Sequence, residues 1–115
     1  MISVKEIKKN HIFNNKSLRE IGQDLGVSKQ YLSFICAQKK NQPELINRQL
    51  LIEFERDKAK YPIHEKIRIK RKLLNYTQAD VANKVGTFAS VVTRIEAGQM
   101  PTSIFVQRLA DYLEV

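Results

Sequence analysis

Residues that form covalent or metal cross-links are nearly absent from this sequence of 115 residues. It contains one cysteine, Cys36, and two histidines, His11 and His64. A single cysteine excludes an internal disulfide and any zinc cluster built on several cysteines. Neither histidine has a partner at the spacing that metal ligands use. We therefore expect no metal and no cofactor, and we expect Cys36 to be a small buried hydrophobe.

Long apolar runs are also missing. The longest apolar runs fall far short of a membrane span, and no apolar stretch follows Met1 as it would in a signal peptide. The sequence shows no nucleophile–base pair, carboxylate dyad, glycine-rich phosphate loop or metal cluster. We therefore expect a cytoplasmic protein that is not an enzyme and has no evident small-molecule ligand.

Positive charge is present in excess. The chain has 20 lysines and arginines against 12 acidic residues, a net charge of +8 and a pI near 9.7. Residues 1–60 carry 12 basic and 7 acidic side chains, and residues 61–115 carry 8 and 5. A short chain with this much positive charge indicates a polyanionic partner. Nucleic acid is the first candidate and an anionic membrane is the second.

An internal repeat appears when the sequence is shifted by 60 positions. Residues 17–35 then lie over residues 77–95, and hydroxyl, acidic, small and branched apolar residues fall on their own kind. The matched pairs are Ser17 with Thr77, Glu20 with Asp80, Ile21 with Val81, Gly22 with Ala82, Leu25 with Val85, Gly26 with Gly86, Leu32 with Val92, Ser33 with Thr93 and Ile35 with Ile95. Each half therefore contains the same kind of unit.

Each unit reads as a set of helices. Capping residues, glycines and apolar spacing predict helices over 17–25, 28–36, 44–60, 63–74, 77–85, 88–96 and 103–114, and no strand. Ile21 and Leu25 share one face of the first of these, and Leu32 and Ile35 form the inward face of the second. Along the long helix, Glu53 with Arg56 and Glu55 with Lys58 are spaced to pair. Phe34 points outward, and we expect it to pack against this long helix.

The spacing within each repeat predicts a helix-turn-helix. Two helices that cross tightly need a small residue at the crossing, which Gly22 and Ala82 provide. The turn needs positive φ, which Gly26 and Gly86 adopt without strain. Two apolar residues then hold the second helix to its domain, so its opposite face is free to enter a major groove.

Residues 63–115 resemble the Cro/C1-type, lambda-repressor-like (XRE) helix-turn-helix family. The resemblance is carried by Ile67-Arg68-Ile69-Lys70-Arg71, Tyr76-Thr77-Gln78-Ala79-Asp80-Val81-Ala82, Val85-Gly86 and Val92-Thr93-Arg94-Ile95-Glu96-Ala97-Gly98. Residues 17–35 resemble the shorter helix-turn-helix of sigma-factor region 4 and resolvase-type proteins. A chain with two such units resembles an internal dimer.

The resemblance implies roles for matched residues of the second half. It implies a structural salt bridge between Arg71 and Glu96, and a phosphate contact for Gln78, which also supports the recognition helix. The family's base-reading positions fall on Ala89, Ser90, Val91, Thr93 and Arg94. The sequence departs from the pattern at Phe88, where a serine or threonine cap is usual, so we expect this helix to start at Thr87. It also has Ala97-Gly98-Gln99 where Asn-Gly-Lys is frequent, which removes one candidate for a backbone contact.

The same geometry names candidates in the first half. Base-reading candidates there are Lys29, Gln30, Tyr31 and Ser33, with Gln30 suited to adenine and Lys29 to guanine or phosphate. For the DNA backbone in both halves we expect contacts from Ser17, Lys39, Lys40, Thr77, Gln78, Arg68 and Lys72. The basic cluster that contains Arg68 and Lys72 either contacts phosphate or is a solvated helix face.

The sequence thus predicts an all-α chain of two tandem helix-turn-helix units of about four helices each, residues 1–60 and 61–115. We expect a sequence-specific double-stranded DNA-binding transcriptional regulator, without a membrane partner, acting as a small repressor in a bacterium or mobile element. Recognition helices 28–36 and 88–96 would lie roughly 34 Å apart in successive major grooves on an asymmetric site. An ordinary homodimer would instead read two identical half-sites. The alternative is an adaptor or antitoxin-like protein in which one unit binds a protein partner.

Overall fold

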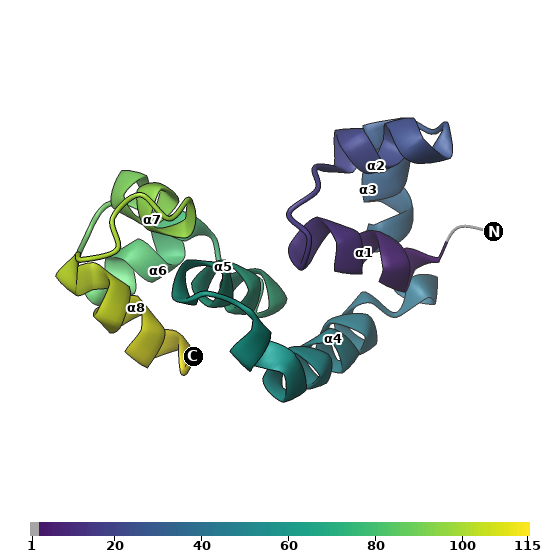
Figure 1. Cartoon of the computed structure of the whole chain (residues 1–115). Helices are drawn as coiled ribbons and strands as arrows, with labels where there is room; N and C mark the ends of the chain where they lie inside the picture. The colour runs from purple at the N-terminus through teal and green to yellow at the C-terminus, as the bar shows by residue number, and fades with distance from the viewer. Residues whose placement is uncertain (1–2) are drawn as a thin grey trace. The chain divides into compact units, whose positions relative to one another are not determined.

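The computed structural model describes residues 3–115, and in this range every regular element is a helix (Figure 1). The predicted all-α class is confirmed. The chain divides into two compact units, Met1–Leu50 and Leu51–Val115, and the division falls inside helix α4, Pro43–Asp57. The division predicted at residues 60 and 61 lies three residues beyond the end of this helix and stays a prediction.

The first unit is built on three short helices and the start of α4. These helices are α1 (Val4–Ile12), α2 (Leu18–Leu25) and α3 (Lys29–Ala37), and a 3-10 turn, η1 (Lys39–Asn41), leads into α4. Ile7, Ile21 and Leu32 form the buried core, one residue from each of the three helices. Leu18, Val27, Ile35 and Cys36 pack around it and are partly buried.

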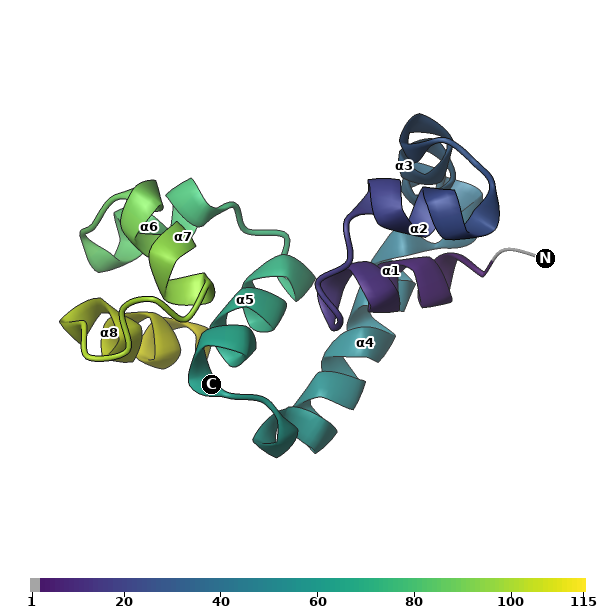
Figure 2. The ribbon, with the colours of Figure 1, turned by 45° about the horizontal axis from the view of Figure 1, so that its top comes forward.

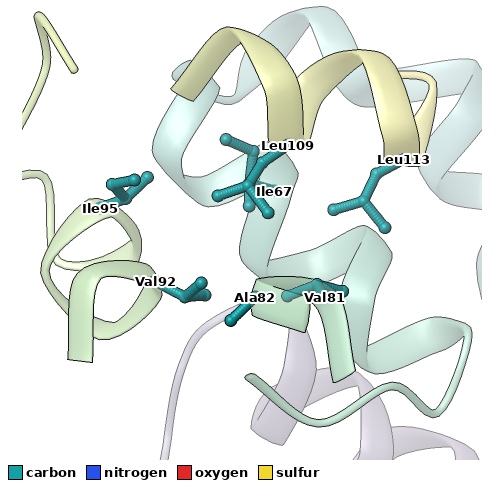
Figure 3. Packing of buried hydrophobic residues seen from close by; sticks show 7 residues of the cluster. All are labelled: Ile67, Val81, Ala82, Val92, Ile95, Leu109 and Leu113. Atoms are coloured by element: carbon teal, nitrogen blue, oxygen red, sulfur yellow. The ribbon is translucent and has the colours of Figure 1, made fainter. Parts of the chain in front are cut away.

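The second unit contains the end of α4, the 3-10 turn η2 (Lys58–Lys60) and four more helices. They are α5 (Ile63–Leu73), α6 (Gln78–Val85), α7 (Ala89–Glu96) and α8 (Ile104–Leu113). Apolar side chains from all four converge on one buried cluster (Figure 3). Its members are Ile67, Val81, Ala82, Val92, Ile95, Leu109 and Leu113.

The turn between helices has the same geometry in both units. Gly26 and Gly86 end α2 and α6 with φ of 73° and 80°, in the left-handed region that glycine adopts freely. The N–H of the next residue then donates to a carbonyl five residues earlier: Val27 to Gly22 and Thr87 to Ala82, each at 2.9 Å. The prediction of a positive-φ turn at both glycines is confirmed.

The small residue at the helix crossing is buried in each unit, but the space available for a side chain at that position differs between the two units. A Cβ built on Gly22 would lie 2.6 Å from the carbonyl oxygen of Val27, closer than non-bonded atoms approach. At the matched position Ala82 is 1% exposed and its methyl group is accommodated in the core. The crossing is therefore tighter in the first unit.

Two predictions about the first unit were wrong. Cys36 is only partly buried, although it was expected to be a buried hydrophobe. Phe34 is 62% exposed, so it does not bury itself against the long helix. Of the two pairs predicted along α4, Glu55 and Lys58 pair at 3.1 Å. The guanidinium of Arg56 pairs with the adjacent Asp57 at 3.0 Å and also interacts with the charge of Glu53.

Candidate nucleic-acid interface

The start of α6 is fixed by a reciprocal capping box. The hydroxyl of Thr77 accepts a hydrogen bond from the N–H of Asp80 at 3.0 Å, and the Asp80 carboxylate accepts one from the N–H of Thr77 at 2.9 Å. The backbone N–H of Thr77 is the main cause that lowers the pKa of Asp80. Two of the unpaired donors of the helix start are satisfied in this way, so the α6 N-terminus is held in one conformation.

Helix α7 starts at Ala89, with Phe88 as its N-cap, so the predicted start at Thr87 was wrong. Thr87 is already engaged, because its N–H closes the C-terminal turn of α6. Phe88 has no side-chain atom that can cap, and only its carbonyl takes part, accepting from the N–H groups of Val91 and Val92.

An ion pair joins α5 to the end of α7. The Arg71 guanidinium donates from Nε to Glu96 Oε2 at 2.6 Å and from Nη2 to Glu96 Oε1 at 2.9 Å. Its Nη1 donates to the carbonyl of Tyr76 at 2.8 Å, in the loop before α6. The two charged side chains are only 9% and 5% exposed. They are therefore a buried bidentate pair, a structural arrangement that fixes α7 against α5.

Gln78 connects this pair to the middle of α7. Its Nε2 donates to Glu96 Oε1 at 3.1 Å, while its Oε1 accepts from the Thr93 hydroxyl at 2.7 Å. The hydroxyl also lies 3.0 Å from the carbonyl of Ala89. One amide at the start of α6 thus holds two positions of α7. The resemblance implied that Gln78 contacts phosphate and supports this helix, and that Thr93 reads a base, but it did not indicate that the two side chains bond to each other.

The predicted base-reading residues of the second unit do not lie equally open. Ser90, Thr93 and Arg94 are exposed on α7, which packs against α6 across the turn (Figure 2). Ala89 and Val91 are half-buried, and Val91 packs against the hydrophobic core. The exposed part of the predicted surface is therefore polar, with one guanidinium that is able to pair with a guanine.

The predicted candidates of the first unit are all exposed. Ser28 caps α3 by accepting from the N–H of Tyr31 at 3.1 Å. The exposed residues are Lys29, Gln30, Tyr31 and Ser33 on α3, and Lys39 and Lys40 on η1. Ser17 caps α2, accepting from the N–H of Glu20 at 3.1 Å. The base-reading candidates thus lie in the first half of α3, Lys39 and Lys40 follow its end, and Ser17 stands at the start of α2.

The two predicted backbone contacts on α5 are set back from solvent. Arg68 is 6% exposed, and Lys72 is half-buried. Burial is the main cause that lowers the pKa of both side chains, and the positive charge of neighbouring arginines lowers that of Lys72 further. Their contact with phosphate stays a prediction. For this contact, a phosphate group would have to approach two side chains that are largely covered by the protein.

Two short helices at a glycine turn, with the second exposing a polar face, define the second unit as a helix-turn-helix domain. Residues 67–115 match the family model described as helix-turn-helix. The match supports a DNA-binding domain of the transcription-regulator type in this part of the chain. Comparison with curated proteins and with solved structures gave no match.

Two kinds of feature are absent from the part of the chain that the structure describes. Within residues 3–115, no three or more His, Cys, Asp or Glu residues are grouped so as to hold a metal ion. No helix in the same range is long and apolar enough to cross a membrane.

Proposed function

We propose that this protein is a sequence-specific double-stranded DNA-binding transcriptional regulator that acts as a small repressor of a bacterial or mobile-element operon. The observation that carries the proposal is the exposed face of α7, with Ser90, Thr93 and Arg94, in a domain that matches the helix-turn-helix family. A domain of this kind represses without further activity when its site overlaps a promoter, because bound protein excludes the polymerase.

In this proposal both units read DNA, α3 as well as α7. The support is the repeated turn: the same glycine conformation and the same 2.9 Å hydrogen bond precede both helices. Lys29 and Gln30 on α3 differ from the matched Ala89 and Ser90 on α7, and the chain as a whole is basic. An internal pseudo-dimer of this kind prefers an asymmetric site, whereas a homodimer reads two identical inverted half-sites.

Phosphate contacts supply the affinity in this proposal. The exposed Lys39 and Lys40 follow α3 directly, and the capped starts of α2 and α6 present backbone N–H groups beside Ser17, Thr77 and Gln78. Binding through several phosphates falls by orders of magnitude between ~50 and ~200 mM salt. A hydrophobic protein interface changes little over the same range.

A second candidate function follows from the exposed aromatic side chains of α3. Phe34 is mostly exposed and Tyr31 is about half exposed, on the helix that would otherwise carry only polar contacts. In this alternative the first unit binds a protein partner, as an adaptor or antitoxin does, and only the second unit reads DNA. Exposed aromatic residues are enriched at protein interfaces.

The test is a selection from random duplex DNA at physiological salt, followed by footprinting. The variants are Lys29→Ala/Gln30→Ala and Arg94→Ala, and Lys60→Ala is a control that removes an exposed charge outside both recognition helices. The proposal expects an asymmetric enriched site, with each variant relaxing a different half and the control unchanged. If only Arg94→Ala relaxes the site, the first unit does not read bases and the protein-partner alternative gains support. If no site is enriched and binding at low salt stays weak, the DNA-regulator proposal fails.

A further inference from the structure

Phe88 stands out at the tip of the candidate interface. It is 77% exposed, although it is the residue immediately before α7 and one of the bulkiest apolar side chains in the second unit. The hydrophobic cluster of that unit does not include it. Its phenyl ring therefore adds little to the packing of the fold.

The same residue also weakens the start of its helix. Serine, threonine, asparagine and aspartate are the residues that stabilise a helix N-terminus. The capping side chain accepts a backbone N–H in five other helices of the described chain, but α7 has no such bond. Those five N-caps are Ser3, Ser17, Ser28, Thr77 and Ser103. Phe88 thus adds little to the core and nothing to the cap, and it stands at the start of the helix whose exposed face carries Ser90, Thr93 and Arg94.

We propose that Phe88 reads the C5-methyl group of a pyrimidine, thymine or 5-methylcytosine, in the major groove. This inference rests on the proposed function and names one feature of the DNA site. A phenyl ring has no hydrogen-bonding group, and the C5-methyl group is the apolar feature that bases present in the major groove. Apolar side chains that wedge between base steps act mainly from the minor groove, which a recognition helix does not enter.

The polar neighbours of Phe88 agree with this role. Ser90 and Arg94 are exposed on α7, and Arg94 is suited to the acceptors of a guanine. An apolar contact at the first turn and a guanidinium further along the helix would read different chemical features of neighbouring base pairs. At the matched position of the first unit stands Ser28, which caps α3, so methyl reading at the N-cap is expected of the second unit only.

The experiment combines protein variants with modified DNA. The full-length chain is titrated with its selected duplex, in which each thymine in turn is replaced by uracil and each cytosine by 5-methylcytosine. The variants are Phe88→Ser, which supplies the missing cap, and Phe88→Leu, which keeps an apolar side chain. Ile52→Ser is the control, because Ile52 is an isoleucine of α4 that is 67% exposed.

The expected result is one position at which the methyl group matters to the wild type and not to Phe88→Ser. Removing that methyl should weaken wild-type binding about fourfold, the ratio that corresponds to one buried CH₂ group. Sensitivity to uracil identifies thymine as the source, and a gain on cytosine methylation identifies 5-methylcytosine. Phe88→Leu keeps part of the effect, Ile52→Ser keeps all of it, and the melting temperature of Phe88→Ser is no lower than that of the wild type.

Two results would overturn the inference. One is a wild type that binds its selected site and ignores every change of C5-methyl group. The other is a Phe88→Ser variant with the same methyl sensitivity as the wild type. Both differ from failure of the proposed function, in which the wild type enriches no site at all.

Discussion

Replacing either member of the Arg71–Glu96 pair should destabilise the second unit strongly. Each charge is nearly inaccessible to solvent, so Glu96→Leu leaves a buried guanidinium whose remaining partner is the carbonyl of Tyr76. Arg71→Met leaves the buried Glu96 carboxylate with the Gln78 amide as its remaining donor among the hydrogen bonds described above. Breaking a buried pair in this way costs about 3–5 kcal/mol. At about 4–8 °C per kcal/mol for a domain of this size, the melting temperature of the second unit should fall by at least about 12 °C.

The double variant Arg71→Met/Glu96→Leu separates the pair from its surroundings. Because it removes both charges together, it should be no less stable than either single variant, with a coupling energy of about 3 kcal/mol or more. Denaturant unfolding of the full chain, followed by far-UV circular dichroism, measures the transition of each unit. The control is Arg56→Met, which removes an exposed pair and should change stability by less than about 1 kcal/mol. Single variants within about 1 kcal/mol of the wild type, or strictly additive losses, would refute this account of the pair.

Three further predictions concern the helix crossings, an ion pair and the thiol. Gly22→Ala should destabilise the first unit by about 1–3 kcal/mol. The cost of overpacking a methyl group against a backbone carbonyl is larger than the roughly 1 kcal/mol by which alanine stabilises a helix relative to glycine. Urea unfolding measures the loss, with Ala82→Gly, which introduces no clash, as the comparison. The hydrogen bond from the Lys70 ammonium is the main cause that lowers the pKa of Glu55. The stability that this ion pair contributes is therefore present above pH 4.5 and is lost as the pH falls through the pKa of Glu55 in the folded chain. Glu55→Gln should flatten this part of a stability–pH curve, and an unchanged curve would contradict the prediction. Burial raises the pKa of Cys36, so alkylation near pH 8 should be slower in the folded chain than in urea, and equal rates would show an open thiol.

Local signals predicted the helices and turns of this protein well. Capping residues such as Thr77 and the glycines at 26 and 86 act through bonds within a few residues, so their effect is visible in the sequence. The 60-residue repeat placed the small residue of each crossing correctly. At the start of α7 the local rule failed, because the turn after Gly86 places Phe88 at the N-cap although Thr87 is the residue that carries a hydroxyl.

Tertiary partners and outward faces were harder to predict. The bonds from Gln78 to Glu96 and from Thr93 to Gln78 join residues 18 and 15 positions apart, and no periodicity encodes them. Phe34 was expected to pack against the long helix because it is apolar, whereas single apolar side chains are common on protein surfaces. The base-reading set stays a prediction, because side-chain exposure does not identify the base that a residue contacts.

The side-chain amide of Gln78 connects the start of α6 with the middle and the end of α7, so a shift at one of these places is transmitted to the others. It bonds to the end of α7 through Glu96 and to its middle through Thr93, while sitting at the start of α6, where a phosphate is expected. A phosphate that pulls on this end would therefore also set the rotation of the helix that reads bases. Contacts to the DNA backbone and to the bases would then not be additive. A change of Gln78 should alter which sequences are preferred as well as how tightly any of them is held.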